Sequence, residues 1–223
     1  MKLPPQSPSS LANFEGCPKR WYLTTIERKY PPSQTEAARW GTAVHEKLEA
    51  FITGGDPLPD YLEFLTPLVR GLQNGNYKIY AELPISINRN WGIEQWRSAS
   101  ASFRGILDLV AIDADRGFAL IVDWKTGKRR PDPSQLLIYA AMLKQLVSVE
   151  FVFTAYVWIK DRNYDSFCLD NTNFEEVKAG IIQRLNNIEK AFEEKEFKAK
   201  PSPLCPWCPA LNDCEEAEKY RKK

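Results

Sequence analysis

Apolar and polar positions recur with two different periods along this chain, and the change between them divides it into regions. Apolar residues spaced three or four positions apart predict helices over 7–28, 35–53 and 60–72. The proline-rich stretch at 30–34 reads as a linker between the first two of them. Residues 7–75 are therefore expected to form a helical N-terminal part.

A period of two, rich in β-branched and aromatic residues, follows and predicts three strands, over 77–87, 102–113 and 118–125. The sequence DADRG between the last two has turn chemistry and predicts an antiparallel hairpin. The remaining elements are a helix opened by Asp132 and Pro133 and ending near Leu146, a buried strand over 149–159, a short edge strand over 166–169 and an amphipathic helix over 174–197. This order predicts an α/β (α+β) fold with a central mixed β-sheet flanked by helices.

The length and composition set the scale of the fold. The chain has 223 residues, 43% hydrophobic and 26% charged, which suits one sizeable core. We expect a single domain over 1–223, with a sheet core at 76–170 and a C-terminal part at 171–223. The sequence lacks both a membrane-spanning apolar run and an N-terminal secretory signal, so a cytoplasmic location is expected.

The net charge is only +1, so binding to a nucleic acid would depend on a local basic patch. One patch lies in the segment KTGKRR and contains Lys125, Lys128, Arg129 and Arg130. A second basic cluster, near the end of the chain, reads as a solvated surface; it consists of Lys219, Arg221, Lys222 and Lys223.

Two acidic residues and a lysine are candidates for chemistry. Asp123 and Lys125 lie two positions apart on one predicted strand and therefore share a face, and the hairpin places Asp108 on the neighbouring strand. Two such carboxylates suit a hard divalent cation, and a lysine beside them suits phosphodiester hydrolysis. The D-x-K pattern is short, however, and also fits an ion pair on an exposed strand.

Two helical pairs add weaker candidates. His45 follows Gly41 and precedes Glu49 at four-residue spacing, so the three share a helix face on which His45 offers a nitrogen ligand and Glu49 could hold the imidazole. Taken alone, a structural His45 and a surface Glu49 fit the same spacing. Gln135 and Tyr139 share a face of a later helix and suit contacts with a phosphate or a base. His45 is the only histidine, which excludes any mechanism or metal site that needs two.

In chain order these residues read G-x3-H, G-x2-D, D-W-K and Q-x3-Y, and that ordered set resembles the RecB-like nucleases of the PD-(D/E)XK superfamily. It is also similar to the AddB nuclease domain and to exonucleases of CRISPR spacer acquisition. The resemblance implies a restriction-endonuclease-like core. It also implies that the metal, Mg²⁺ or Mn²⁺, is bound by His45, Asp108, Asp123 and the main-chain carbonyl of Trp124. Asp108, Asp123, Lys125, Gln135 and Tyr139 would then be the catalytic and substrate-binding residues. Glu82, on the preceding strand, is not counted as a ligand.

The cysteines give a second signal. Cys205, Cys208 and Cys214 crowd into ten residues among prolines, which in a reducing compartment suggests a metal rather than disulfides. The resemblance adds Cys17 as a fourth thiolate and implies a [4Fe–4S] cluster that joins the two ends of the chain. Zinc fits the same four cysteines by spacing alone. Cys168 is left over and reads as a small buried apolar residue.

The sequence thus predicts a metal-dependent DNA nuclease, and exonuclease action on single strands or DNA ends is the expectation that the resemblance favours. Its partners would be DNA and proteins of recombination, repair or CRISPR adaptation. The alternative is a non-catalytic DNA-binding or scaffold subunit with a structural iron–sulfur or zinc site, and a redox protein ranks third.

Overall fold

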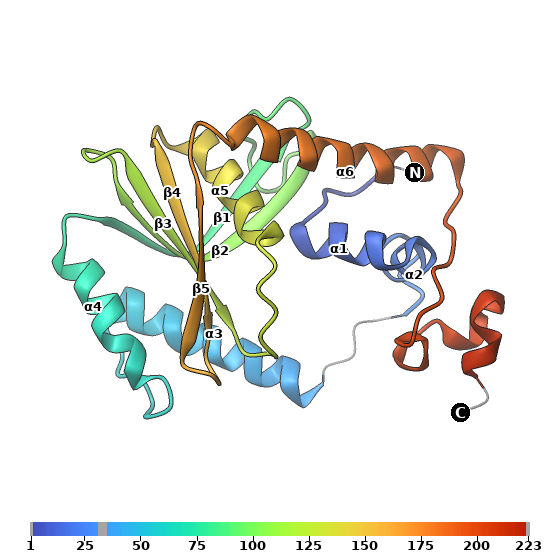
Figure 1. Ribbon diagram of the computed structural model, residues 1–223, viewed down its shortest axis with the longest axis horizontal. Coiled ribbons are helices and arrows are strands. Elements are labelled where there is room, and N and C mark those ends of the chain that lie inside the picture. The colour runs from blue at the N-terminus through green and yellow to red at the C-terminus, as the bar shows by residue number, and fades with distance from the viewer. Residues whose placement is uncertain (1, 31–34, 222–223) are drawn as a thin grey trace. The chain divides into compact units, whose positions relative to one another are not determined.

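The chain separates into two compact units in a computed structural model that describes residues 2–30 and 35–221 (Figure 1). One unit is Gln34–Ala179, and the other combines Met1–Ser33 with Gly180–Lys223. The expectation of one domain over the whole chain stays a prediction. The predicted linker falls almost entirely on residues 31–34, which lie outside the described residues, as do Lys222 and Lys223 of the second basic cluster.

The larger unit is built on a five-stranded mixed sheet whose strands follow one another in chain order, as Figure 1 shows. The strands are β1 (Lys78–Asn88), β2 (Ala101–Asp113), β3 (Phe118–Lys125), β4 (Phe151–Trp158) and β5 (Asn163–Leu169). Neighbours are antiparallel except β3 and β4, which are parallel and joined through helix α5 (Ser134–Leu146). A parallel pair needs such a crossover. The predicted mixed sheet, the hairpin and the helix after Pro133 are confirmed.

Successive side chains of β3 point to opposite faces of the sheet. Val122 and Trp124 pack in an apolar core with helices α3 (Glu36–Gly54) and α4 (Thr66–Asn74). Asp123 and Lys125 point the other way, toward α5. The core beneath α3 is fully apolar and includes Val44, Leu48, Phe51, Leu65, Val69, Leu109 and Val157.

The paired strands β1 and β2 are distorted at one level. Glu82 lies opposite Asp108, between the pairs Ala81–Leu109 and Leu83–Leu107, and its φ is 48°. This left-handed backbone is costly for a residue with a side chain and persists only where surrounding structure enforces it. On one side of this level, Leu109 packs with α3, whereas Gly105 on the other side lies under Tyr139 of α5. At Glu82 and Asp108, therefore, the β1–β2 pair twists. The same side of β2 faces α3 at Leu109 and α5 at Gly105.

The first predicted helix is broken more strongly than a single kink. Helix α1 (Pro8–Gly16) begins with the Ser7 hydroxyl accepting a hydrogen bond from the amide of Ser10. Cys17 then adopts an extended backbone before the short helix α2 (Pro18–Trp21) and a π-helical turn, η1 (Tyr22–Ile26). Pro18 favours a non-helical backbone at the residue before it, so the helix predicted over 7–28 is interrupted at Cys17.

Other element boundaries shift by a few residues. The third predicted helix starts late: after the short 3-10 turn η2 (Glu63–Leu65), α4 begins at Thr66, where Pro67 suits the first turn. The edge strand β5 begins three residues before its predicted start at 166. Helix α6 (Phe174–Glu194) ends before its predicted limit at 197, because Lys195 adopts a φ of 53°.

The smaller unit packs around Trp21, which is fully buried. Its indole meets Phe14 edge to face at 5.3 Å and donates a hydrogen bond to the Ser10 hydroxyl at 2.8 Å. Three short 3-10 turns carry the cysteine-rich segment: η3 (Cys205–Trp207), η4 (Leu211–Asp213) and η5 (Glu215–Tyr220). Across residues 2–30 and 35–221, none of the helices is long and apolar enough to cross a membrane.

Candidate metal centre and active site

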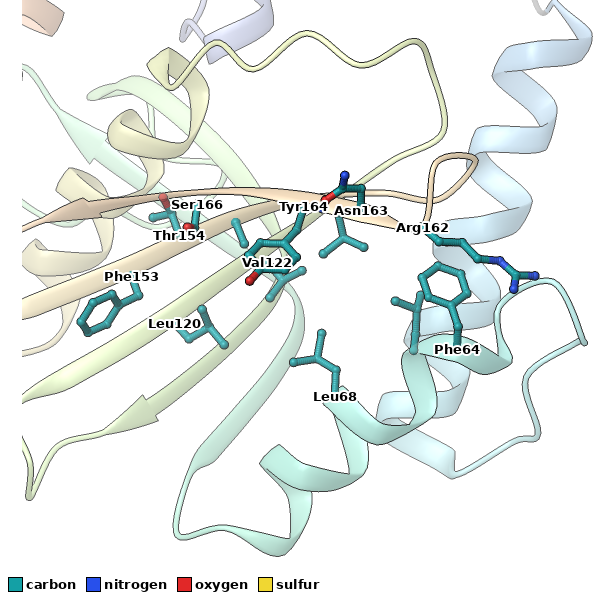
Figure 2. A pocket seen from close by; sticks show the side chains of 13 residues that line it. Phe64, Leu68, Leu120, Val122, Phe153, Thr154, Arg162, Asn163, Tyr164 and Ser166 are labelled. Carbon is teal, nitrogen blue, oxygen red and sulfur yellow. Dashed lines mark hydrogen bonds between the residues drawn. The ribbon is translucent and has the colours of Figure 1, made fainter.

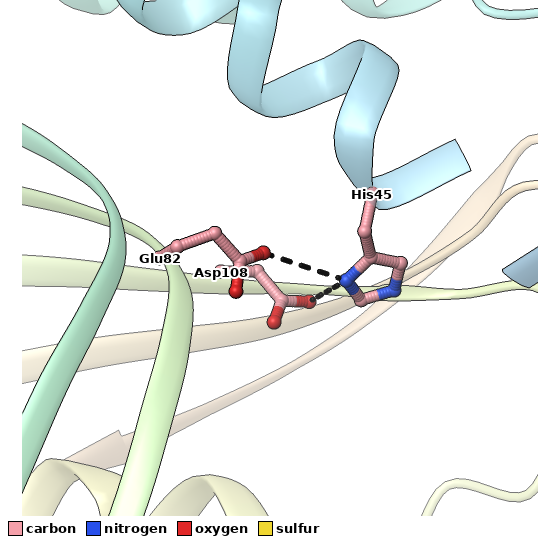
Figure 3. Close-up of side chains that lie close together, drawn as sticks. All are labelled: His45, Glu82 and Asp108. Carbon is pink, nitrogen blue, oxygen red and sulfur yellow. Dashed lines mark ion pairs between the residues drawn. The ribbon is translucent and has the colours of Figure 1, made fainter. Parts of the chain in front are cut away.

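Three carboxylates lie at the same level of three neighbouring strands. Glu82 of β1 is opposite Asp108 of β2, and the register Leu109–Val122 places Asp108 beside Asp123 of β3. Helix α3 brings His45 to this row (Figure 3). Among the described residues, only His45, Glu82 and Asp108 gather three metal-ligating atoms within 4.8 Å of one another. The row is therefore the best-formed cation site in the described part of the chain.

The hydrogen bonds of His45 determine which of its ring nitrogens can bind a metal. Nε2 lies 3.0 Å from the main-chain oxygen of Trp124, and a carbonyl can only accept, so Nε2 carries the proton. Nδ1, on the other side of the ring, is then the nitrogen available to a cation. Nδ1 lies 3.5 Å from Asp108 Oδ2 and 3.7 Å from Glu82 Oε1. A histidine that donates one N–H to a carbonyl while its other nitrogen faces acidic oxygens has the usual arrangement of a metal ligand.

The two aspartates are buried, Asp108 at 9% exposure and Asp123 at 3%. Burial raises the pKa of Asp108 well above its ordinary value, and the neighbouring Asp123 charge raises that pKa further, while the hydrogen bond from the Trp124 amide opposes the shift. Burial also raises the pKa of Asp123, against the opposing charge of Lys125. Burial likewise raises the pKa of Glu82. A divalent cation would offset this accumulation of buried negative charge.

Asp123, Lys125 and Gln135 form one connected group. The Lys125 ammonium lies 2.6 Å from Asp123 Oδ2 and donates a hydrogen bond to Gln135 Oε1 at 3.0 Å. Gln135 in turn donates to Asp123 Oδ1 at 2.7 Å. Asp123 Oδ2 is buried, and the Lys125 ammonium is paired with it at 2.6 Å. A carboxylate oxygen has two lone pairs, so Asp123 Oδ2 can also bind a cation.

Both motif glycines permit a close approach that builds the site. A Cβ at Gly105 would lie 2.5 Å from the ring of Tyr139, so only glycine lets that ring rest against β2. A Cβ at Gly41 would lie 3.2 Å from the Thr126 hydroxyl, which follows Lys125. Burial raises the pKa of Tyr139 above its ordinary value, so its hydroxyl stays protonated and able to donate.

The structure brings the sequence-predicted residues together around this row. His45 contacts Asp108 and the Trp124 carbonyl, while Lys125, Asp123 and Gln135 contact one another. Within the described residues, no hydrogen bond joins Glu49 to His45, although both line the same cleft. Glu49 therefore does not hold the imidazole as the sequence suggested. The acidic side chain of β1 next to the imidazole is Glu82, whose Oε1 lies 3.7 Å from Nδ1.

Glu82 is the residue that sequence reasoning discounted. Its position opposite Asp108 follows from strand register, and its left-handed backbone turns the side chain to His45. Neither feature has a reliable signature in the residues around it. The one available signal was its place on the strand before the acidic pair.

The predicted basic patch is divided by an ion pair. Arg129 donates through Nε to Asp165 Oδ2 at 2.9 Å and is also paired through its Nη2, so it holds the β3–α5 loop against β5. This ion pair raises the pKa of Arg129 and lowers that of Asp165. Lys128 and Arg130 are exposed on the same loop. The loop therefore presents cationic side chains a few residues from Lys125.

Four of the five cysteines line one cavity in the smaller unit, and these are the four that the sequence predicted: Cys17, Cys205, Cys208 and Cys214. Backbone amides point at two of the sulfurs, from Lys200 to Cys17 at 3.4 Å and from Ser202 to Cys205 at 3.2 Å. Cys168 belongs to β5 and lines a different part of the chain.

A wider hollow of about 410 Å³ lies elsewhere on the larger unit, between α4 and strands β3 to β5 (Figure 2). Its wall is mostly apolar, and no carboxylate lines it. Arg162 at its edge lies over the Phe64 ring. The hollow has none of the carboxylates that gather in the row at Asp108, so the row is the candidate cation site and the hollow is not.

Comparison with known proteins identifies the family of the chain. The profile of the PD-(D/E)XK nuclease superfamily matches residues 5–215, so the chain belongs to that superfamily. It is therefore a nuclease-family protein, and members of this superfamily use divalent metals. No curated protein matches the sequence.

Two solved structures share the fold at low sequence identity. The protein SSO0001 is 13% identical, with a TM-score of 0.53, and the match covers 96% of this chain and 88% of that one. A proposed exonuclease from Eubacterium rectale is 12% identical, also with a TM-score of 0.53, over 93% of this chain and 92% of that one. These likenesses establish the architecture.

Proposed function

We propose that the protein is a divalent-metal-dependent DNA nuclease that removes nucleotides from single strands or DNA ends. The observation that carries the proposal is that Nδ1 of His45 faces Asp108 and Glu82. Mg²⁺ or Mn²⁺ would be held by His45, Asp108, Glu82 and Asp123. When bound, the cation would supply positive charge that polarises the phosphodiester and stabilises its transition state.

The protein's own groups complete the reaction centre. The Lys125 ammonium, fixed by Asp123 and Gln135, can donate to an attacking water or to a phosphoryl oxygen on which negative charge develops. Gln135 holds both partners in place from α5. The protonated Tyr139 hydroxyl can donate a hydrogen bond to substrate. The exposed Lys128 and Arg130 would contact the backbone phosphates.

Glu82 modifies the ligand set that the superfamily resemblance implied. The Trp124 carbonyl already accepts the Nε2 hydrogen of His45, whereas Glu82 Oε1 lies on the Nδ1 side of the ring. We therefore place Glu82 among the ligands, with the Trp124 carbonyl orienting the imidazole.

For the cysteine cavity we propose a [4Fe–4S] cluster rather than zinc. The superfamily resemblance favours the cluster, and the four cysteines that it implies line one cavity. The amides aimed at Cys17 and Cys205 suit thiolate ligands.

A cleavage assay tests the proposed activity. End-labelled single-stranded and duplex DNA, each blocked at the 5′ or the 3′ end, would be incubated with the protein in Mn²⁺ or in EDTA. We expect cleavage in Mn²⁺ alone, reduced at least about 100-fold in Lys125→Ala, because that change removes a donor to the developing charge. Blocking one end should suppress cleavage if the enzyme is an exonuclease.

The control variant is Lys160→Ala, which removes an exposed lysine that lies over the Trp40 ring, outside the row. It should cleave as the unchanged protein does. DNA binding without cleavage in Mn²⁺ would instead support the non-catalytic subunit. Roles in recombination, repair or CRISPR adaptation remain predictions from resemblance.

A further inference from the structure

The connection between β1 and β2, residues 89–100, carries surface chemistry that the reaction centre does not use. Two of its apolar side chains are exposed, Ile93 at 43% and Trp96 at 37%. Arg97 is exposed beside them. We call this segment the Trp96 loop. Exposed tryptophans in an ordered segment are candidates for binding, since burial of this ring is the usual outcome.

The Trp96 loop is held in one shape from within. Asn88 accepts hydrogen bonds from the amides of Asn90 and Gly92 and donates to the Glu94 carboxylate. Trp91 is 5% exposed and packs against Phe174. With its base anchored in this way, the loop presents Trp96 without the entropic cost of ordering a flexible segment on binding.

Charge around Trp96 is positive. The Arg104 guanidinium lies 5.5 Å from the Trp96 ring and donates to the Ser98 carbonyl at 3.3 Å. Its Nε is buried without a hydrogen-bond partner. The loop and its flank contain three arginines, at 89, 97 and 104, against one acid, Glu94, which is engaged by Asn88. An aromatic ring among arginines matches a nucleobase with its phosphates.

The strands connect this surface to the reaction centre. Asn88 follows Glu82 by six residues on β1, which spans about 20 Å at about 3.3 Å per residue. Stacked nucleotides rise about 3.4 Å each, so about six of them cover that distance. A strand of that length could reach from the acidic row to the Trp96 loop.

We propose that the Trp96 loop is a stacking platform for unpaired bases of a single-stranded substrate, with Trp96 as the contact ring and Arg97 as a phosphate contact. The inference rests on the proposed nuclease function and specifies its substrate as single-stranded DNA that extends several nucleotides from the scissile bond. A duplex would not use the platform, because its base faces are covered by their own stacking.

Binding without cleavage tests the platform. Fluorescein-labelled oligo(dT) of about 20 nucleotides would be titrated with protein in EDTA, followed by anisotropy. Trp96→Ala should raise the Kd about tenfold, and Trp96→Phe should restore most of the affinity because it keeps a stacking face. An oligo(dT) of about four nucleotides is too short to reach from the reaction centre to the Trp96 loop. In Mn²⁺, Trp96→Ala, Trp96→Phe and the unchanged protein should therefore cleave it at equal rates.

The matched control is Tyr164→Ala, which removes an aromatic ring that is 65% exposed on β5, at the apolar hollow. It should bind as the unchanged protein does. Equal affinity of Trp96→Ala and the unchanged protein would overturn the platform, as would a protein that does not bind oligo(dT) at all. The cleavage assay above decides the proposed function separately. A circular dichroism melt of Trp96→Ala checks that the fold is kept.

Discussion

Asp108 is a carboxylate whose burial beside other carboxylates lowers the stability of the folded protein. The carboxylate is nearly buried beside Asp123 and Glu82, and it accepts a hydrogen bond from the Trp124 amide at 2.8 Å. Its pKa is raised by burial first and by the neighbouring charge of Asp123 second. A residue kept in such a position despite its electrostatic cost is typical of a functional site.

Asp108→Asn should therefore stabilise the metal-free protein while it abolishes cleavage. Because the pKa of Asp108 is raised in the folded protein, its carboxyl group keeps a proton there at pH values at which the unfolded chain has lost it. The unfolded chain loses this proton at about pH 3.9. Stability contributed at Asp108 is then lost as the pH rises from that value through the folded pKa. The Tm gain of Asp108→Asn in EDTA should be larger at about pH 8 than at about pH 5. A variant that melts lower than the unchanged protein at both pH values would contradict this account.

Individual residues also mark what could be read from the sequence. The strand period and the hairpin predicted that Asp108, Asp123 and Lys125 lie together, whereas His45 was joined to them through the superfamily resemblance. Glu82 escaped because a φ of 48° within a strand is enforced by tertiary packing. The Trp124 carbonyl was predicted as a ligand from resemblance, and only its distance from His45 Nε2 suggests an orienting role.

At the scale of elements, the site depends on α5 lying close to β2. Gly105 makes that possible because the Tyr139 ring occupies the space of its missing Cβ. The sequence predicted both elements and their order. It could not show that Gly105 leaves the space in which the Tyr139 ring packs. That relation depends on how a helix crosses a strand far from it in the chain.

Gly105→Ala should destabilise the protein by about 1–3 kcal/mol, since the added methyl must displace Tyr139 or the backbone. It should also weaken cleavage, because α5 carries Gln135 as well. Chemical denaturation and the cleavage assay measure the two effects.

The matched control for that variant is Gly71→Ala in α4, where nothing lies within 4 Å of the added Cβ. This control should leave stability unchanged or raise it by up to about 1 kcal/mol, as expected for glycine within a helix. Equal stability of Gly105→Ala and Gly71→Ala would show that the contact with Tyr139 is not restrictive.

At the scale of the whole molecule, the cysteines join segments that are far apart in the chain. Cys17 and Cys205 line one cavity although 188 positions separate them in the sequence. Ion pairs within the same unit link the same segments, between Lys19 and Glu216 and between Lys29 and Asp213. The element order predicted the mixed sheet, whereas the division into two compact units depends on long-range contacts and was not foreseen.

Cys205→Ser should bleach the visible absorbance of the purified protein and lower its free energy of unfolding by on the order of 2–4 kcal/mol, as loss of a long-range cross-link does. Cys168→Ser is the control, because Cys168 does not line the cavity, and it should keep the colour. A colourless unchanged protein with one bound zinc by elemental analysis would replace the cluster with the zinc alternative.

The central claim is that one imidazole and a row of carboxylates bind a divalent cation. Crystals soaked in Mn²⁺ and measured at the manganese absorption edge test it most directly. We expect an anomalous peak about 2.3 Å from His45 Nδ1 and from carboxylate oxygens of Asp108 and Glu82, and its loss in Asp108→Asn. Manganese bound elsewhere, with no density in this row, would contradict the account.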